Sequence, residues 1–217
     1  MIYFNCDYLE GGHPKILEKM LSTNKEQLTG YSTDHYCDSA RERIRQACGC
    51  PDADVHFLVG GTQTNLTAIA SILRPYQGVL AAHDGHIACH ETGAIEATGH
   101  KVLPIPCVDG KITADQVREF CHSHQTNTMR EHMVQPGMVY ISFPTEIGSL
   151  YTKKELKELS AACHENGIPL YIDGARMGYG LTSPDADVTL QDIASLCDMF
   201  YIGGTKCGAV MGEALVI

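Results

Sequence analysis

Two charged residues in this sequence each follow a short apolar run and stand beside glycine. Asp173 ends the run 170–172, and Lys206 follows the run 199–202 and two glycines. A lysine amine can hold an aldehyde as an imine, and a carboxylate can keep a pyridine nitrogen protonated, so that the ring becomes an electron sink. A carboxylate buried at a strand end is costly without a partner, and a cationic ring would compensate it. The pair therefore predicts a pyridoxal-phosphate enzyme.

Further residues fit the same chemistry. Arg176 carries a planar guanidinium that suits a carboxylate or the ring oxygen. Gly61 and Thr62 lie at a strand–glycine–helix junction, where open backbone N–H groups and the Thr62 hydroxyl would hold a phosphate. His86 begins a predicted helix, and its imidazole can stack on a planar ring or act as a base near neutral pH. His90, one turn later, is a second candidate for proton transfer.

Each residue also has an ordinary structural interpretation. Lys206 alone would be a solvated turn lysine, and His86 alone would bind backbone at a helix start. Asp173 and Arg176 alone would be an ion pair that holds a turn together. Glycine-rich turns between strands and helices are common, so only the combination favours a cofactor site.

Strand-like and helical segments alternate along the chain, which predicts an α/β fold with a mostly parallel sheet covered on both faces. Ligands bind such sheets beyond the carboxyl ends of the strands, where Gly61, Asp173 and Lys206 fall. The expected helices are 14–22, 39–47, 62–73, 86–97, 113–122, 152–166 and 190–196. The expected strands are 55–59, 78–82, 102–105, 138–143, 169–172, 199–202, 209–210 and 214–217.

Composition narrows the class of protein. The 217 residues carry a net charge of −10 without a basic patch, so nucleic acid is not an expected partner. No apolar run reaches roughly 18 residues, so no membrane span is expected, and the N-terminus lacks the features of a secretory signal. The ten scattered cysteines suggest reduced thiols in the cytoplasm. The densest histidine cluster, 122–124, has no nearby carboxylate, so no metal site is predicted.

The order of these motifs resembles a known family. The glycine-rich turn, Asp-Gly-His-Ile at 84–87, Ile-Asp-Gly-Ala-Arg at 172–176 and Gly-Thr-Lys at 204–206 resemble the low-specificity L-threonine aldolases. These belong to the aromatic amino acid β-eliminating lyase group, with the aspartate aminotransferase fold (fold type I) and a three-layer α/β/α large domain. The resemblance runs from about residue 7 to residue 217.

The resemblance implies a role for each site residue. Gly61 and Thr62 would hold the cofactor phosphate, and His86 would stack on the ring. Asp173 would pair with the ring nitrogen, and Lys206 would carry the cofactor. Arg176 would contact the ring oxygen or the substrate carboxylate. Asp7 matches the acidic residue of a Ser-Asp-Thr segment that contacts substrate in the family, with Cys6 in place of the serine.

The implied reaction is retro-aldol cleavage of β-hydroxy amino acids such as L-threonine or L-allo-threonine to glycine and an aldehyde. His86, or a water that it positions, would take the hydroxyl proton. A β-eliminating lyase, an aminotransferase, or a cofactor-binding fragment without turnover remain as alternatives. The family shares its active site between subunits, so a homodimer or homotetramer is expected.

The expected organisation is an N-terminal segment, 1–50, followed by a cofactor-binding large domain, 51–217. The chain ends in an apolar strand soon after Lys206, which suggests truncation before the small C-terminal domain that supplies a further arginine in the family. Segment 144–149 stands where the family has Thr-His-Asn, so different bracing of the site is expected.

Overall fold

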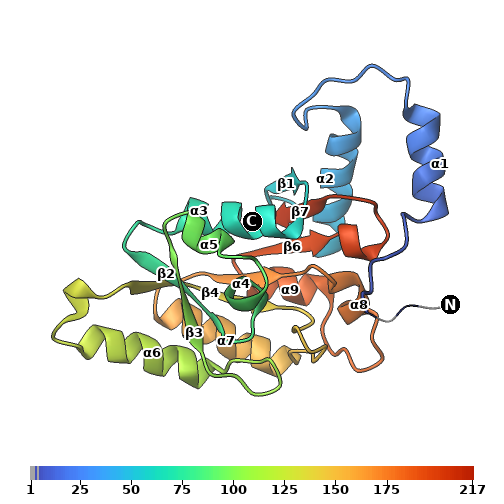
Figure 1. Ribbon diagram of the computed structural model, residues 1–217. Helices are drawn as coiled ribbons and strands as arrows, with labels where there is room; N and C mark the ends of the chain where they lie inside the picture. The colour runs from blue at the N-terminus through green and yellow to red at the C-terminus, as the bar shows by residue number, and fades with distance from the viewer. Residues whose placement is uncertain (1–2, 4) are drawn as a thin grey trace.

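A seven-stranded sheet forms the centre of the computed structural model, which describes residue 3 and residues 5–217 (Figure 1). The strand order is β1-β7-β6-β5-β4-β2-β3, and within the described chain only β7 runs antiparallel to its neighbours. The strands are β1 (Val55–Leu58), β2 (Gln77–Ala82), β3 (Lys101–Ile105), β4 (Gln135–Ser142), β5 (Leu170–Asp173), β6 (Met199–Gly203) and β7 (Glu213–Val216). The predicted mostly parallel sheet is confirmed.

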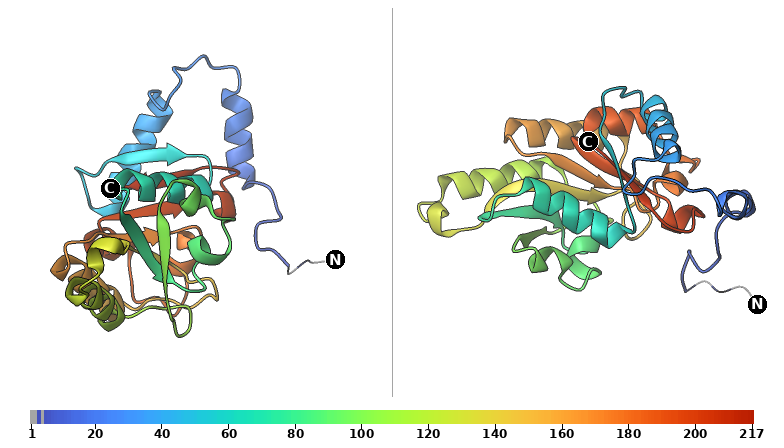
Figure 2. Two further views of the ribbon diagram at one scale, coloured as in Figure 1. Left: turned by 60° about the vertical axis from the view of Figure 1, so that its left-hand side comes forward. Right: turned by 90° about the horizontal axis from the view of Figure 1, so that it is seen from above.

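Both faces of the sheet are buried, as its continuous apolar strands require. Along β4, Met138 and Tyr140 point to one core and Val139 and Ile141 to the other, because side chains alternate along a strand. Helices cover the two faces as separate layers, which confirms the three-layer arrangement (Figure 2). One layer contains α3 (Gly61–Ile72), α4 (His86–Cys89) and α5 (Ala94–Ala97), and the other contains α2 (His35–Cys48), α6 (Ala114–Thr126), α7 (Lys153–Glu165) and α9 (Leu190–Leu196).

Local sequence explains where several helices begin and end. The α7 helix starts with a capping box between Thr152 and Glu155, and Gly167 follows its end with φ 64°. The α2 helix begins at His35 rather than at the predicted residue 39, because Asp34 accepts from two backbone N–H groups of the first turn. A short helix, α8 (Met177–Leu181), was not predicted.

Two predicted elements are wrong. The helix expected over 86–97 is broken into α4 and α5, because Thr92 (φ 56°) and Gly93 (φ 75°) adopt left-handed conformations. The strand expected at 209–210 is a loop, in which Gly208, Val210 and Gly212 also have positive φ. This loop reverses the chain between β6 and β7, which makes β7 antiparallel.

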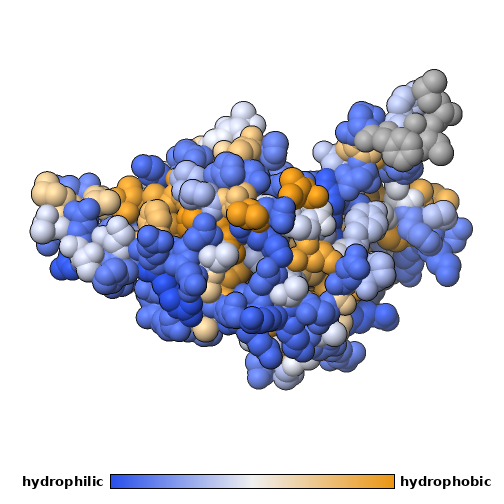
Figure 3. Space-filling model, turned by 90° about the horizontal axis from the view of Figure 1, so that it is seen from below, coloured by the Kyte–Doolittle hydropathy of each residue, from blue (hydrophilic) through white to orange (hydrophobic). Residues whose placement is uncertain are grey.

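The α1 helix (Pro14–Thr23) stands away from the sheet and contains no buried residue (Figure 1). Its apolar side chains Leu17, Met20 and Leu21 are exposed. Across the face seen in Figure 3, apolar side chains are interspersed among hydrophilic ones. Among the helices that the structure describes, none has the length and apolar character needed to cross a membrane.

Candidate functional site

Asp173 lies at the carboxyl end of β5 and is only 4% exposed. Its Oδ2 accepts from the Tyr140 hydroxyl at 2.5 Å and from Asn65 Nδ2 at 2.9 Å. Its Oδ1 accepts from the Ala175 backbone N–H at 2.9 Å. All three donors are neutral, and no lysine or arginine of the described chain forms an ion pair with this carboxylate. A buried carboxylate of this kind is suited to a cationic ligand.

Asn65, on α3, joins this carboxylate to a second one. Its Nδ2 also donates to Glu91 Oε1 at 2.8 Å, and its Oδ1 accepts from the Tyr171 hydroxyl at 2.8 Å. Glu91 is buried, and its Oε2 has no partner among the described residues. We refer to Asp173, Asn65, Glu91, Tyr140 and Tyr171 as the Asp173 network. Sequence reasoning identified only Asp173 among its five members.

The tyrosines of this network are held as neutral donors. Burial, reinforced by the charge of Asp173, raises the pKa of Tyr140 and of Tyr171 well above the ordinary value. The two rings pack edge to face with their centroids 5.7 Å apart. Because both hydroxyls keep their protons, they cannot take the place of a cationic partner for Asp173.

His86, at the start of α4, faces the same carboxylates. Its Nδ1 lies 3.0 Å from Glu91 Oε1. This hydrogen bond is the main reason that the pKa of His86 lies above its ordinary value, with smaller contributions from the charges of Glu146 and Asp173. His90 is exposed, and its ring centroid is 5.8 Å from that of His86. Glu91 therefore fixes the orientation of the His86 ring.

Gly61 and Thr62 form the first turn of α3, whose leading N–H groups have no partner within the helix. A Cβ atom on Gly61 would lie 3.0 Å from the Tyr201 hydroxyl oxygen, so a larger residue would crowd that tyrosine. Thr62 is exposed at the helix start. The position of this turn beside β6 is consistent with a phosphate site.

Arg176 and Lys206 meet the N-terminal segment. The Arg176 guanidinium donates through Nε and Nη2 to the Asp7 carboxylate, with Nη2 2.8 Å from Oδ1. Lys206 Nζ lies 5.1 Å from the centroid of the Tyr8 ring, and Arg176 Cζ lies 5.9 Å from it. Cys6 adjoins the same tyrosine and is the main reason that the pKa of Tyr8 is raised. The N-terminal residues 6–8 thus lie beside Arg176 and Lys206, which are far away in the sequence.

Asp7 and Arg176 remain partly open to solvent, at 49% and 32% side-chain exposure. The hydrogen bond from Arg176 is the main reason that the pKa of Asp7 is lowered. Because Asp7 occupies Nε and Nη2, it leaves Nη1 of the guanidinium for another acceptor.

Glu146 lies close to both His86 and Arg176. Its charge contributes to the raised pKa of His86, after the Glu91 hydrogen bond, and to the raised pKa of Arg176, after the Asp7 hydrogen bond. Ser142 donates to Glu146 Oε1 at 3.0 Å. Glu146 belongs to segment 144–149, so this part of the chain braces the site with a carboxylate.

These residues fit pyridoxal phosphate. Asp173 supplies a buried anion that lacks a cationic partner among the described residues, and Lys206 supplies an amine. Arg176 supplies a donor for carboxylate, and the start of α3 supplies N–H groups for phosphate. Together they match the donor types that this cofactor needs.

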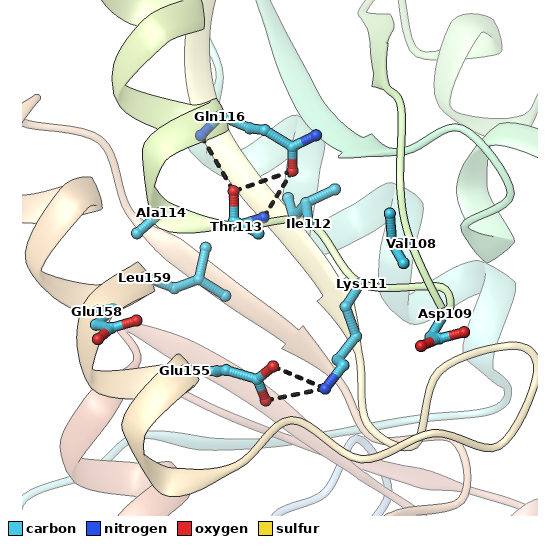
Figure 4. Close-up of a pocket in the computed structure, with 10 residues that line it drawn as sticks. All are labelled: Val108, Asp109, Lys111, Ile112, Thr113, Ala114, Gln116, Glu155, Glu158 and Leu159. Carbon is cyan, nitrogen blue, oxygen red and sulfur yellow. Dashed lines mark hydrogen bonds and ion pairs between the residues drawn. The ribbon is translucent and has the colours of Figure 1, made fainter.

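A cavity of about 510 Å³ lies elsewhere, between the loop before α6 and the α7 helix (Figure 4). Its lysine, Lys111, is already paired with Glu155 through contacts of 2.7 and 3.0 Å. Thr113 and Gln116 form the capping box of α6. These polar groups are therefore already engaged with one another, and the cavity contains none of the predicted site residues.

Comparison with known proteins identifies the family to which this chain belongs. Residues 4–217 match the model of the beta-eliminating lyase family. The chain is 31% identical over 218 residues to a low specificity L-threonine aldolase of Pseudomonas sp. (strain NCIMB 10558), a match that covers 98% of this chain and 61% of that protein. A similar match, 29% identical, is found with the Pseudomonas aeruginosa enzyme of the same name. The chain thus spans about three fifths of the length of these curated relatives.

Solved structures show the same relationship. The threonine aldolase of Leishmania major superposes with a TM-score of 0.93 at 52% identity, covering 97% of this chain and 60% of that one. A PLP-bound C-S lyase of Staphylococcus hominis, 14% identical, has a TM-score of 0.69 and covers 95% of this chain and 54% of that one, which shows a shared fold. The chain belongs to the beta-eliminating lyase family of pyridoxal-phosphate-dependent enzymes.

Proposed function

We propose that the protein containing this chain is an aldehyde-lyase that cleaves β-hydroxy amino acids such as L-threonine or L-allo-threonine to glycine and an aldehyde. The observation that carries this proposal is Asp173, a buried carboxylate that receives only neutral hydrogen bonds and lies three residues from Arg176. The similarity to threonine aldolases of Pseudomonas and Leishmania supports the choice of reaction.

Four residues would hold pyridoxal phosphate. Lys206 would bind its aldehyde and Asp173 its ring nitrogen, while the N–H groups of Gly61 and Thr62 would bind its phosphate. When bound, the cofactor supplies an electron sink for the carbon–carbon bond that breaks. Asn65 and Tyr140 keep Asp173 oriented, and its ionised form would be stabilised by a protonated ring. His86 would cover the ring face.

The remaining residues would handle the substrate. Arg176 would bind the substrate carboxylate through Nη1, beside the atoms that Asp7 occupies. Asp7 and Cys6, from the N-terminal segment, would contact the amino acid. With Nδ1 of His86 engaged by Glu91, Nε2 would accept the proton of the substrate hydroxyl, directly or through a water.

We also propose a homodimer or homotetramer in the cytoplasm. An exposed α1 helix that carries Leu17, Met20 and Leu21 without a buried residue supports a contact with a second subunit. Ten free cysteines support a reducing compartment. Residues 51–217 would form the cofactor-binding domain, with 1–50 as a segment that completes the site.

The test uses the purified full-length protein. Bound cofactor should give the protein a visible absorbance. Borohydride should reduce the imine to a permanent bond between the cofactor and Lys206, and peptide mass mapping should locate that bond. Lys206→Ala should lose both the bond and the activity, whereas Lys157→Ala, an exposed lysine on α7, should retain them. A Lys206→Ala variant that still forms the bond would contradict the assignment.

Product analysis separates the possible reactions. With L-threonine, aldol cleavage yields glycine and acetaldehyde in equal amounts. A keto acid and ammonia would instead indicate a β-eliminating lyase, and a new amino acid formed from an added keto acid would indicate an aminotransferase. A protein that binds cofactor but forms none of these products would be a binding fragment.

A further inference from the structure

Three side chains of metal-binding type converge beyond the ends of β2 and β3. His83 and Asp84 follow β2, and Cys107 follows β3. Their ligand atoms all lie within 4.8 Å of one another. The Cys107 sulfur is 3.4 Å from His83 Nδ1 and 3.0 Å from Asp84 Oδ1. None of the three has a role in the proposed lyase reaction.

The sheet holds these positions in place. Ala82 and Ile105 are partners in the parallel pairing of β2 and β3, so the residues that follow them leave the sheet side by side. The His83 N–H donates to the Ile105 carbonyl at 2.8 Å, which continues the pairing by one residue. The Gly85 N–H donates to the Ala82 carbonyl at 2.9 Å and closes a turn around His83 and Asp84. The cluster is therefore built on rigid backbone from two strands.

The spacing suits a tetrahedral metal. Zinc bonds of about 2.0–2.3 Å to nitrogen, oxygen and sulfur place neighbouring ligand atoms about 3.3–3.8 Å apart. The 3.4 Å contact lies within this range and the 3.0 Å contact lies just below it, so the side chains would shift to coordinate the ion. A thiolate and a carboxylate together neutralise a divalent cation, and a neutral imidazole completes a donor set typical of zinc.

We propose that His83, Asp84 and Cys107 form a Zn²⁺ site with a fourth position open to water. His83 is exposed and the other two are partly buried, so the ion enters from solvent. The three ligands are none of the residues proposed to hold the cofactor, and the site does not depend on the proposed lyase function.

Zn²⁺ would replace an existing hydrogen bond, because the Cys107 thiol donates to Asp84 Oδ1 at 3.0 Å. Binding breaks the S–H bond, forms a bond from sulfur to Zn²⁺, and releases the proton to solvent.

Metal binding by the full-length protein tests the proposal. Equilibrium dialysis against Zn²⁺, followed by elemental analysis, should give one tightly bound ion per chain. Co²⁺ should give a thiolate-to-metal charge-transfer band, recorded as a difference spectrum against the metal-free sample so that cofactor absorbance cancels. Cys107→Ser should abolish the band and weaken Zn²⁺ binding about 100-fold or more. Asp84→Asn should weaken binding at least about 10-fold.

Cys37→Ser is the matched control. Cys37 is a partly buried thiol beside the carboxylate of Asp34 but has no place in the cluster. This variant should bind Zn²⁺ and Co²⁺ as the unmodified protein does. The proposal is overturned if the unmodified protein shows no charge-transfer band, or if Cys107→Ser and Cys37→Ser affect Zn²⁺ binding equally. Circular dichroism should show that both variants remain folded, so that a loss of Zn²⁺ binding reports on the site itself.

Discussion

The two ends of the candidate active site are built in different ways. The Asp173 network is buried in the sheet, and its polar groups are joined by hydrogen bonds of 2.5–2.9 Å. The N-terminal arm, residues 5–34, is mostly exposed (Figure 1). Its ties to the rest of the described chain include the Asp7–Arg176 pair and bonds from His13 N–H to Gly208 O and from Arg41 to Ser32 O.

The buried network and the exposed arm should therefore differ in rigidity. Buried polar groups are costly to leave unpaired, so the network admits few alternative arrangements. Exposed ion pairs contribute little to stability, so the arm can move at low cost. The end that would hold the cofactor ring is therefore preorganised, whereas the end that would receive the substrate is adjustable. The four predictions below test this contrast.

The largest effect is expected for Asp173→Asn. This change removes the buried anion that would stabilise a protonated ring, so turnover by the full-length protein should fall by about 10²–10³-fold. Thermal stability without cofactor should also fall, because the amide oxygen can still accept from Tyr140 and Asn65 but the amide nitrogen cannot accept from the Ala175 N–H. Activity and melting temperature check this, with exposed Asp185→Asn as the control. Unchanged turnover in Asp173→Asn would remove the basis of the proposed function.

The second-largest effect is expected for Tyr140→Phe. It removes a hydrogen bond to a buried carboxylate and should lower the free energy of unfolding by about 2 kcal/mol, measured by urea denaturation. Tyr76→Phe is the control, because the Tyr76 hydroxyl accepts from Arg74 at the surface. Equal losses in the two variants would show that the network is no more rigid than the surface.

His86 provides a pH test. Its folded-state pKa is raised, mainly by Glu91, so its contribution to stability is complete below the ordinary histidine pKa of about 6.5 and is lost as pH rises through the folded value. NMR titration of the His86 ring should show a lower pKa in Glu91→Gln than in the unmodified protein. Glu96→Gln, an exposed change on α5, should leave the titration unaltered. A titration insensitive to Glu91 would contradict the contact seen here.

The smallest effect on stability is expected for Asp7→Asn. The pKa of Asp7 is lowered by Arg176, so its contribution is present above the ordinary value of 3.8 and is lost as pH falls through the folded value. Because both side chains are partly exposed, that contribution should be at most about 1 kcal/mol. KM for the amino acid should nevertheless change, since the arm borders Arg176. A large loss of stability would show that the arm is part of the core.

The fold was largely predictable from sequence because its elements follow local rules. Apolar runs marked most strands, and Gly167 and Thr152 marked the limits of α7. The break at Thr92 and Gly93 was missed because the residues around it resemble a continuous helix. Nothing local indicates that β7 runs antiparallel, since that direction depends on the loop at 208–212.

The site was predictable only in part, for a similar physical reason. Asp173 and Lys206 were proposed as site residues because each stands at or shortly beyond the end of an apolar strand, beside glycine. Asn65 was missed because its partner Asp173 is 108 residues away, and no sequence spacing records that contact. The only sequence signal was its position four residues after Gly61, one helical turn beyond the predicted phosphate site. His83 and Cys107 were missed similarly, since pairing of β2 and β3 brings them together.

The amide of Asn65 can adopt only one orientation. Its oxygen accepts from Tyr171 and its nitrogen faces two carboxylates, so a 180° turn would point the oxygen at both anions. A carboxylate at position 65 would add a third negative charge. An alkyl group would leave Tyr171, Glu91 and Asp173 without this hydrogen-bond partner. We therefore expect selection from a library randomised at position 65 to return asparagine alone, unless Asp173 or Glu91 is randomised with it.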